Sequence, residues 1–523
     1  MTAHHLAVLA LPLLVSCSVS TDTTQDADVP QSGYLPNHNI DPALIPKWSI
    51  KWKNNYNMGE TFYAKPLVYT PPYWATEGLI TASNQNVIRL IDGVTGNLVR
   101  SRTLDPPFKS VDASCGDVPG TTGIIGTPYI DTAKDIMYFF SKGYKKGAPG
   151  GGRDNAQYKL YAVTLPWFGN VPGFPVVLDG LVAVNDKSRR FDSGIALQRP
   201  SVASVGNSIV AAFGSNCDHF NYTGFLLTVS KTNGAVQSLW ATMAAPGATQ
   251  NSRGAGIWQS GVGLAVDGSH VWFATGNGIG GPGENGAKKP ASGKKPIGAL
   301  QEAVAHFEVG NDGSLHPLDY FQPFDYADLD KVDADIGVGG VALLSPTTFK
   351  ARNGARMAIV GGKGGKLYLM DAGNLGGFMN GPGGSDAVLQ IIKPSRSYFG
   401  GTASYPLEGG YLYFITAPRG PLLSYRFNAG GNEYFTLAGQ SDVVFNGKNA
   451  PIVTSLNGKP GTAVVWTADT DMGLRAFYAV PSNGKLVQIP LPVTGRITKM
   501  QRPVFGNGRV YTTYDNAVIC LGL

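Results

Sequence analysis

Short apolar runs alternate with small and polar residues along most of the chain, and they recur within one strand–turn–strand phrase. In this phrase an apolar run with an aromatic residue leads to a small residue or Asp, then to a turn that contains glycine, then to a second short apolar run. Its copies lie at Arg89–Leu104, Lys159–Asn170, Phe225–Met243, Ala305–Phe321, Lys366–Gly377, Leu422–Ala438, Leu474–Pro492 and, truncated, Ala517–Leu523. Self-similarity at such a period is typical of closed or stacked repeat folds.

Each copy is preceded by an opening strand rich in small residues and a middle strand rich in β-branched and aromatic residues. Eight copies of three or four strands predict an all-β protein, an eight-bladed β-propeller over residues 46–523. The last copy ends at Leu523 directly after its third strand, so its fourth strand has to come from elsewhere. Pro46–Lys53 alternates as a strand does, and we expect it to close the ring and remove an open sheet edge. A seven-bladed ring is the alternative if one weak copy is only a loop.

The composition agrees with many short strands joined by tight turns. Hydrophobic residues make up 43% of the 523 residues and charged residues only 15%, below the roughly 25% of ordinary domains. The 69 glycines and 35 prolines account for about a fifth of the chain, and long helical periodicities are absent. Two insertions, Lys142–Lys159 and Gly278–Leu300, lengthen loops, and such loops either carry specificity or vary freely.

The N-terminal residues indicate export. Residues 1–20 hold an apolar run, Leu6–Val15, followed by small residues, which predicts a signal peptide too short to span a membrane. The alternative is a lipid anchor on Cys17, because the residues before it also fit a bacterial lipoprotein cleavage box. Residues 21–45 are polar and aperiodic, which predicts a flexible leader. No later stretch reaches transmembrane length, so we expect a secreted, extracellular protein. We also expect it to be a monomer.

Three cysteines remain after the predicted signal peptide. In an oxidising compartment we expect Cys115 and Cys217, both in polar loops, to form a disulfide, and Cys520 to be a buried small hydrophobe. Asn221 begins the one glycosylation sequon, which predicts a glycoprotein if the source is eukaryotic. The net charge of +6 is mild for this length and the basic residues are not interleaved with aromatic ones, so a nucleic-acid partner is not expected.

Several enzyme classes lack support in this sequence. There is no nucleophile elbow, no H-E-x-x-H motif and no phosphate-binding glycine loop, and none of the seven histidines pairs at metal-ligand spacing. Serine hydrolase, zinc protease and nucleotide chemistry are therefore excluded as leading hypotheses.

Three segments near the expected ring axis are dense in polar residues: Gly256–Gly261 with the following Thr275–Asn277, then Asp333–Gly337, then Gly361–Lys366. Tryptophan offers a flat apolar face, asparagine an oxygen for Ca²⁺, aspartate a base or metal ligand, and lysine an anion partner. Together these types suit a planar anionic ligand bound with calcium. Each residue alone is also explained by blade packing or turn chemistry.

At these residues the chain resembles the quinoprotein alcohol dehydrogenases, which depend on pyrroloquinoline quinone (PQQ), and the wider PQQ-like repeat propellers. In that family a Trp stacks under the quinone and a T-G-N segment gives an Asn ligand to Ca²⁺, and Trp258 and Thr275–Asn277 look like this pair. The resemblance implies that Asp335 is the catalytic base and a metal ligand. It also implies PQQ and calcium as cofactors, with these further residues: Trp258, Gln259 and Lys363 for PQQ, and Asn277 and, loosely, Asp218 for calcium.

The chain also departs from the family. A single Cys115 stands where the family has two adjacent cysteines, and no C-x-x-C-H haem site exists, so electrons would pass to an external acceptor. The leading hypothesis is a secreted quinoprotein oxidoreductase acting on a small alcohol or sugar. One alternative is a propeller without cofactor that binds proteins or glycans, and another is a propeller lyase or isomerase.

Overall fold

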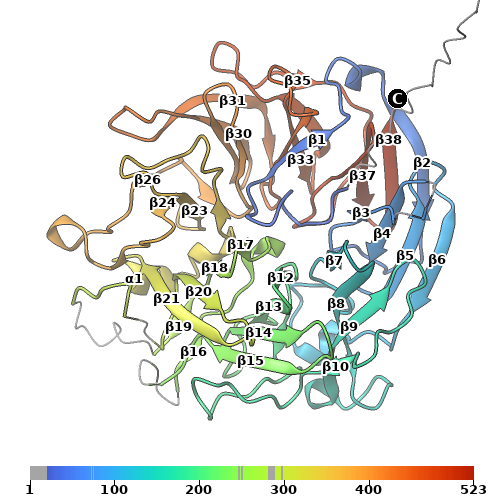
Figure 1. Ribbon diagram of the computed structural model, residues 1–523, viewed down its shortest axis with the longest axis vertical. Coiled ribbons are helices and arrows are strands. Elements are labelled where there is room, and N and C mark those ends of the chain that lie inside the picture. Colours follow the sequence, from blue (N-terminus) through green and yellow to red (C-terminus); the bar gives the residue numbers. More distant parts are fainter. Residues whose placement is uncertain are drawn as a thin grey trace, which may run out of the picture.

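The strands form a closed ring of sheets around a common centre, and the chain runs once around this ring (Figure 1). The computed structural model describes residues 21–71, 73–74, 76–245, 248, 251–280, 289–295 and 298–523. Within these residues eight sheets of four or five strands make the blades, as predicted, and the seven-bladed alternative is wrong. The predicted signal peptide, Cys17 and part of the second insertion lie outside the described residues.

The strands of the first three blades are consecutive in sequence, whereas the fourth blade omits one short strand and gains a later one. They are β3 (Leu67–Val68), β4 (Gly78–Ala82), β5 (Val87–Asp92) and β6 (Leu98–Thr103); β7 (Tyr129–Asp131), β8 (Ile136–Tyr144), β9 (Ala156–Thr164) and β10 (Val176–Val177); β11 (Ala196–Leu197), β12 (Ala203–Val205), β13 (Ser208–Ser215), β14 (Phe225–Ser230) and β15 (Val236–Ala241); and β17 (Ala265–Asp267), β18 (His270–Ala274), β20 (Val304–Val309), β21 (Leu315–Gln322) and β25 (Gly377–Phe378).

The last two blades each include a strand from the N-terminal part of the chain. The second half of the ring consists of β22 (Ala342–Leu343), β23 (Met357–Gly361), β24 (Leu367–Asp371) and β26 (Gln390–Ile392); β27 (Ser397–Tyr398), β28 (Ala403–Tyr405), β29 (Tyr411–Ala417), β30 (Gly420–Phe427) and β31 (Phe435–Phe445); β1 (Tyr34–His38), β32 (Ile452–Leu456), β33 (Val464–Asp469), β34 (Gly473–Tyr478) and β35 (Gln488–Ile489); and β2 (Ser49–Asn55), β36 (Val504–Gly506), β37 (Arg509–Tyr514) and β38 (Ala517–Gly522). Outside the blades lie β16 (Arg253–Gly254) paired with β19 (Gly278–Ile279), and the short helix α1 (Tyr326–Lys331).

The repeated phrase of the sequence is the hairpin between the last two strands of a blade, and its turn has a local physical cause. In the first blade the carboxylate of Asp92 accepts the N–H groups of Val94 and Thr95 at 2.9 and 2.8 Å. Gly96 then adopts a φ of +77°, which residues with a side chain rarely adopt. The missing side chain also makes room for Trp52, because a Cβ on Gly96 would lie 2.7 Å from the indole.

The ring is closed as the sequence predicted. Strand β2 pairs antiparallel with β38 from Ser49 opposite Gly522 to Asn55 opposite Ala517, so the first and last segments share one sheet. Blades pack face to face around the ring; for example, Phe140 and Leu160 of the second blade share a buried cluster with Phe213 of the third. The last strand of the chain, β38, is thus paired on both sides, by β2 and by β37, and does not form an open edge.

Residues 21–45, expected to form a flexible leader, instead pack against the opening strands of the blades. The backbone N–H groups of Val266, Leu343, Ser404 and Val453, in four successive blades, donate to carbonyls of residues 29–33 at 2.8–3.1 Å. This segment therefore crosses the centre of the ring. It continues as β1, which pairs in parallel with β32.

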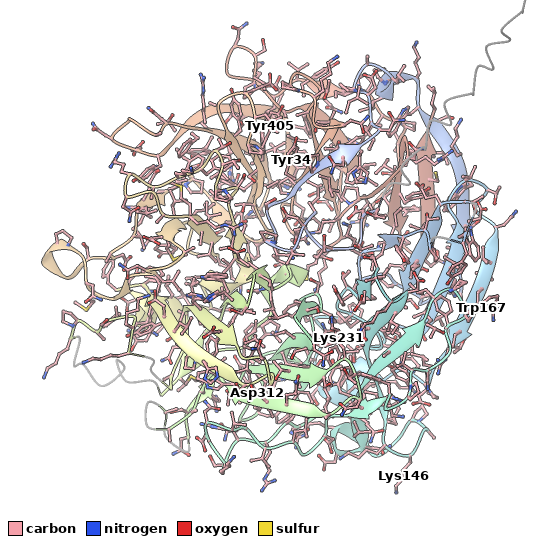
Figure 2. The ribbon with its side chains drawn as sticks, viewed as in Figure 1. Tyr34, Lys146, Trp167, Lys231, Asp312 and Tyr405 are labelled. Atoms are coloured by element: carbon pink, nitrogen blue, oxygen red, sulfur yellow. A yellow bond between two sulfur atoms is a disulfide. The ribbon has the colours of Figure 1, made fainter. Side chains whose placement is uncertain are left out.

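Ion pairs fix the same segment, which we call the N-terminal plug (residues 21–33). Asp22 contacts Lys65 and Asp26 contacts Arg502, each at 2.6 Å and with all four side chains almost fully buried. Beyond the plug, Tyr34 packs edge-on against Tyr405 at 5.6 Å between ring centres (Figure 2). The composition indicated a leader because these residues are polar, but their polar groups have partners far away in sequence.

No helix in the described part of the chain is long and apolar enough to cross a membrane.

Candidate functional site

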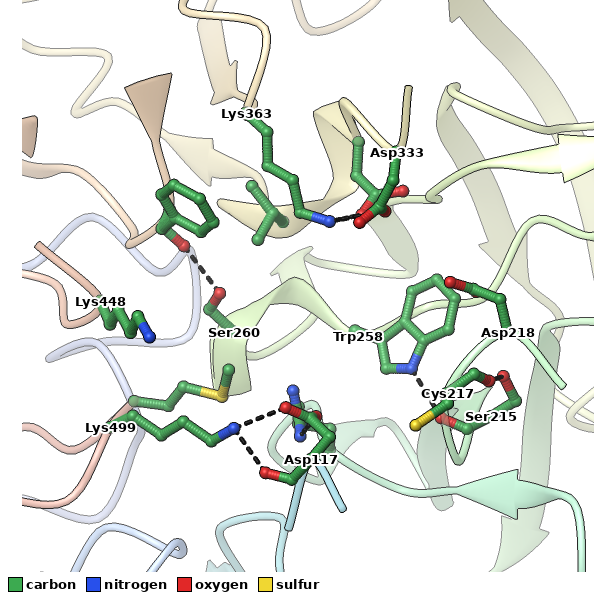
Figure 3. Close-up of a pocket in the computed structure, with 15 residues that line it drawn as sticks. Asp117, Ser215, Cys217, Asp218, Trp258, Ser260, Asp333, Lys363, Lys448 and Lys499 are labelled. Atoms are coloured by element: carbon green, nitrogen blue, oxygen red, sulfur yellow. Dashed lines mark hydrogen bonds and ion pairs between the residues drawn. The ribbon is translucent and has the colours of Figure 1, made fainter. Parts of the chain in front are cut away.

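One cavity of about 400 Å³ is lined by loops from nearly every blade, so it lies on the ring axis (Figure 3). Its volume falls in the range typical of small-molecule sites. The lining side chains are Asp117, Arg199, Ser215, Cys217, Asp218, Trp258, Ser260, Asp333, Asp335, Val338, Lys363, Phe399, Lys448, Lys499 and Met500. Trp258, Asp218, Asp335 and Lys363, all predicted from the sequence, therefore meet in one cavity.

Trp258 provides a fixed aromatic wall of this cavity. Its Nε1 donates to the carbonyl of Ser215 at 2.9 Å. Three glycines allow backbone to approach the ring: a Cβ added at Gly214, Gly256 or Gly276 would lie 2.5–2.8 Å from indole atoms. Because no other residue fits at these positions without movement, the indole is held in place before any ligand binds.

Gln259, predicted to bind the cofactor, does not line the cavity. Its side chain is fully buried, with Nε2 donating to the carbonyls of Val262 and Gly263 and Oε1 accepting the N–H of Ala274. The side-chain amide of Gln259 therefore stabilises the turn after Trp258. The prediction was wrong because adjacency to Trp258 in sequence does not place two side chains on the same side of a tight turn.

Asp335 lies at the centre of a network of hydrogen bonds and ion pairs. Its Oδ1 accepts the backbone N–H of Asn277 at 2.7 Å, and its Oδ2 contacts the Nζ of Lys363 at 2.5 Å. Lys363 also contacts Asp333 at 2.7 Å. Burial opposes the charge on Lys363, but the two carboxylates prevail and raise its pKa above the ordinary value. Asp335 and Lys363, far apart in the sequence, therefore form one charged unit at the cavity wall.

The three predicted calcium ligands gather around one tyrosine. The hydroxyl of Tyr222 donates to Asp218 at 2.7 Å and lies 3.4 Å from Oδ1 of Asn277, whose N–H in turn contacts Asp335. Burial, and then the charge of Asp218, raise the pKa of Tyr222 well above its ordinary value. Among the described residues, no group of three or more His, Cys, Asp or Glu side chains is arranged to hold a metal ion.

Glu302 is a buried carboxyl group behind Asp335 that the sequence did not single out. Its side chain is fully buried, its Oε2 accepts the N–H of Ile336 at 2.7 Å, and its own N–H donates to the carbonyl of Gly276. Burial, and then the negative charge of Asp335, raise the pKa of Glu302 well above its ordinary value. Glu302 thus ties the loop of Gly276 to the turn that carries Asp335.

A second group of charged residues faces the cavity from other blades (Figure 3). Asp117 contacts Arg199 at 2.5 Å and Lys499 at 2.6 Å. Although burial opposes it, these two cations lower the pKa of Asp117 well below its usual range. Lys448 is exposed and makes no ion pair within the described ranges. No sequence pattern marks this group, because its members lie in separate loops without a shared motif.

The predicted disulfide is present and reaches the cavity. Cys115 and Cys217 are bonded, with their Cα atoms 5.8 Å apart, and Cys520 is free and buried, as expected. The bond joins the loop of Asp117 to the loop of Asp218 across a sequence separation of 102 residues. Asn221, the predicted glycosylation site, is exposed four residues after Cys217.

Comparisons with known proteins show the fold of this chain. No protein-family model matches it, and no curated protein matches its sequence. The chain is similar in structure to quinohemoprotein alcohol dehydrogenases from Pseudomonas putida HK5 (TM-score 0.64, 11% identity) and Comamonas testosteroni (0.60, 12%), covering 96% of this chain and 80% of each of those. It is also similar to a europium-containing methanol dehydrogenase (TM-score 0.56, 11% identity, covering 96% of this chain and 98% of that one).

At such low identity the likeness concerns the arrangement of the blades, and the chemistry has to be argued from the residues of this chain. The fold is nevertheless the one that the sequence predicted. The fold of this protein is an eight-bladed β-propeller, similar to that of the quinohemoprotein alcohol dehydrogenases.

Proposed function

We propose that the axial cavity binds a planar quinone of the PQQ class and that the protein uses it to oxidise an alcohol or a sugar. The observation that carries this proposal is the meeting, in one cavity, of the fixed indole of Trp258 with the Asp335–Lys363 ion pair. A rigid aromatic face suits stacking of a planar ligand, and a carboxylate beside it suits proton transfer.

The residues present fit a polyanionic quinone. The indole is fixed by Ser215 and by the close approach of Gly214, Gly256 and Gly276, so a planar ring would stack on it with little ordering cost. Lys363 lines the same cavity as the indole and offers a cation for an oxygen of the ligand. The coarse similarity to the PQQ-dependent alcohol dehydrogenases agrees with this assignment.

For calcium the chain offers oxygen donors of the right type. Asn277, Asp335 and Asp218 would hold the ion, with the hydroxyl of Tyr222 between them. Ca²⁺ takes six to eight oxygen ligands, so the cofactor and water would have to complete the set. Tyr222 contacts the side chains of Asp218 and Asn277, so binding of the ion would require Tyr222 to share or yield these contacts.

The chain's own residues define the steps around the substrate. The bound quinone would supply a two-electron acceptor, and an external acceptor would regenerate it. Asp335 takes the proton of the substrate hydroxyl as the carbon is oxidised to a carbonyl. Lys363 keeps an ion pair throughout, because its second partner Asp333 retains a negative charge when Asp335 becomes neutral. Glu302 holds the turn of Asp335 through the N–H of Ile336.

The test is reconstitution of purified protein with PQQ and Ca²⁺. We expect a bound chromophore at near-stoichiometric cofactor and reduction of an artificial dye with at least one member of a panel of alcohols and sugars. Asp335→Asn should retain the chromophore and lose turnover by about 100-fold or more, as expected for removal of a general base. Asp333→Asn is the matched control, since it changes the same lysine's other partner.

Two outcomes would contradict the proposal. Absence of bound PQQ at micromolar cofactor would remove the oxidoreductase function and leave the scaffold or lyase alternatives. Retained turnover in Asp335→Asn would remove Asp335 from the catalytic role.

A further inference from the structure

The side of the cavity formed by Arg199, Lys499 and Lys448 has an excess of positive charge. Asp117 is the carboxylate among the cavity-lining residues that contacts this group, and it pairs with both Arg199 and Lys499. Lys448 has no ion-pair partner within the described residues and is exposed. This side of the cavity therefore holds three cations and one carboxylate, a local charge of about +2.

Two further observations indicate that this group favours binding of an anion. The side chain of Arg199 is only 7% exposed, yet its Nε has no hydrogen-bond partner in the described structure. A buried donor without a hydrogen-bond partner is unfavourable, and more so when the group is charged. Burial and repulsion by Arg199 also lower the pKa of Lys499. A ligand oxygen would relieve both costs.

The opposite side of the same cavity has the other sign. Asp333 and Asp335 share Lys363, and Asp218 adds a further carboxylate. Figure 3 shows Lys448 and Lys499 on one side of Trp258 and Asp218 on the other. Ser260 lies between the lysines and Trp258. A ligand whose hydroxyl lies near Asp335 would direct an anionic substituent toward Arg199 rather than toward the carboxylates.

We propose that Arg199, Lys499 and Lys448 form a carboxylate-binding subsite, so that the substrate is an alcohol that also carries a carboxylate, such as a sugar acid or a hydroxy acid. The assignment of this ligand as the substrate rests on the proposed oxidoreductase function, whereas binding of the carboxylate does not. The planar fork of an arginine matches two carboxylate oxygens, and lysines add charge without fixing geometry.

The experiment measures binding of a matched pair of ligands by calorimetry, with and without PQQ. D-galacturonate and D-galactose differ in the carboxylate, so their affinity ratio reports the subsite. We expect galacturonate to bind about 10- to 100-fold more tightly at low salt, with the ratio falling as salt screens the charges. Arg199→Met should lower the ratio to near one. Lys448→Met should lower it about threefold, and it removes an exposed side chain that the fold does not need.

Lys485→Met is the control for a general change in charge, because Lys485 is 62% exposed, contacts Asp442 and does not line the cavity. This variant should keep the wild-type ratio. Equal affinities for galacturonate and galactose in the wild type would overturn the proposal. It would also be overturned if the basic variants weaken PQQ binding while the sugar ratio stays constant, because the cations would then serve the carboxylates of the cofactor.

The two proposals fail separately. Loss of PQQ binding with a retained galacturonate preference contradicts the oxidoreductase function and leaves the subsite. Bound PQQ without the preference contradicts the subsite and leaves the oxidoreductase function.

Discussion

Neutralising Asp26 should destabilise the protein strongly, because this residue compensates a fully buried arginine. The Nε of Arg502 contacts Asp26 at 2.6 Å, and the side chains are 0% and 2% exposed. The remaining partners of the guanidinium are the carbonyls of Ser260 and Met500, at 3.2 and 2.7 Å. In Asp26→Asn these carbonyls would have to support the charge alone.

The magnitude follows from the burial of the pair. Removing one partner of a buried ion pair costs about 3–5 kcal/mol, since the other charge stays desolvated and uncompensated. This is a large share of the roughly 5–15 kcal/mol by which a protein is stable. An exposed pair contributes about 0–1 kcal/mol, so Asp442→Asn, which breaks the exposed contact with Lys485, serves as the control.

The assay is urea unfolding at neutral pH, followed by circular dichroism and tryptophan fluorescence. We expect Asp26→Asn to lower the midpoint clearly and Asp442→Asn to leave it nearly unchanged. The double variant Asp26→Leu with Arg502→Met should recover much of the loss, because it removes both charges together. A loss of stability in Asp26→Asn no larger than that in the surface control would contradict this prediction. It is equally contradicted if the double variant is less stable by the sum of its two single changes.

Three further predictions concern other buried or constrained positions. Burial lowers the pKa of Lys142 from 10.5 to about 7. Between these two pH values the unfolded chain binds more protons than the folded one, so the free energy of unfolding rises with pH across this window. Lys142→Met should therefore raise the melting temperature more at pH 7 than at pH 9.5, and an equal gain at both values would contradict the assignment. Gly276→Ala places a Cβ 2.6 Å from a carboxylate oxygen of Asp335, and we expect its affinity for PQQ, measured by spectral titration, to fall at least tenfold. Gly116→Ala meets no atom within 4 Å and should bind as the wild type does; similar affinities in the two variants would count against a tightly packed site. Cys115→Ser opens a loop of about a hundred residues and should cost about 2–4 kcal/mol in urea unfolding, whereas an unchanged midpoint would show that the bond constrains little.

Much of the architecture was predictable because each blade is encoded locally. The turn at Asp92–Gly96 needs only an aspartate that caps the following N–H groups and a glycine at positive φ, and both are visible in the repeated phrase. The closing strand was found for a related reason: the last copy lacked a partner and Pro46–Lys53 had the alternation of a strand.

The N-terminal plug was not predictable from pattern. Its residues are polar and aperiodic, and these features indicate disorder when no partner is known. Asp22 and Asp26 are ordered because Lys65 and Arg502 lie against them, the latter 476 residues away in sequence. No local signal encodes a contact over such a distance.

The same contrast holds within the cavity. Local pattern is enough to predict an all-β chain of repeated blades. It also singles out Trp258, Asn277, Asp335 and Lys363, because tryptophan, asparagine and charged residues break the blade pattern in the loops that carry them. Three features became visible only in the folded ring: Gln259 faces away from the cavity, Glu302 supports the turn of Asp335, and Arg199 and Lys499 share Asp117. Strands and turns follow from local dihedral preferences and alternation, whereas a site on the axis of a ring is assembled from loops that become neighbours only when the ring closes.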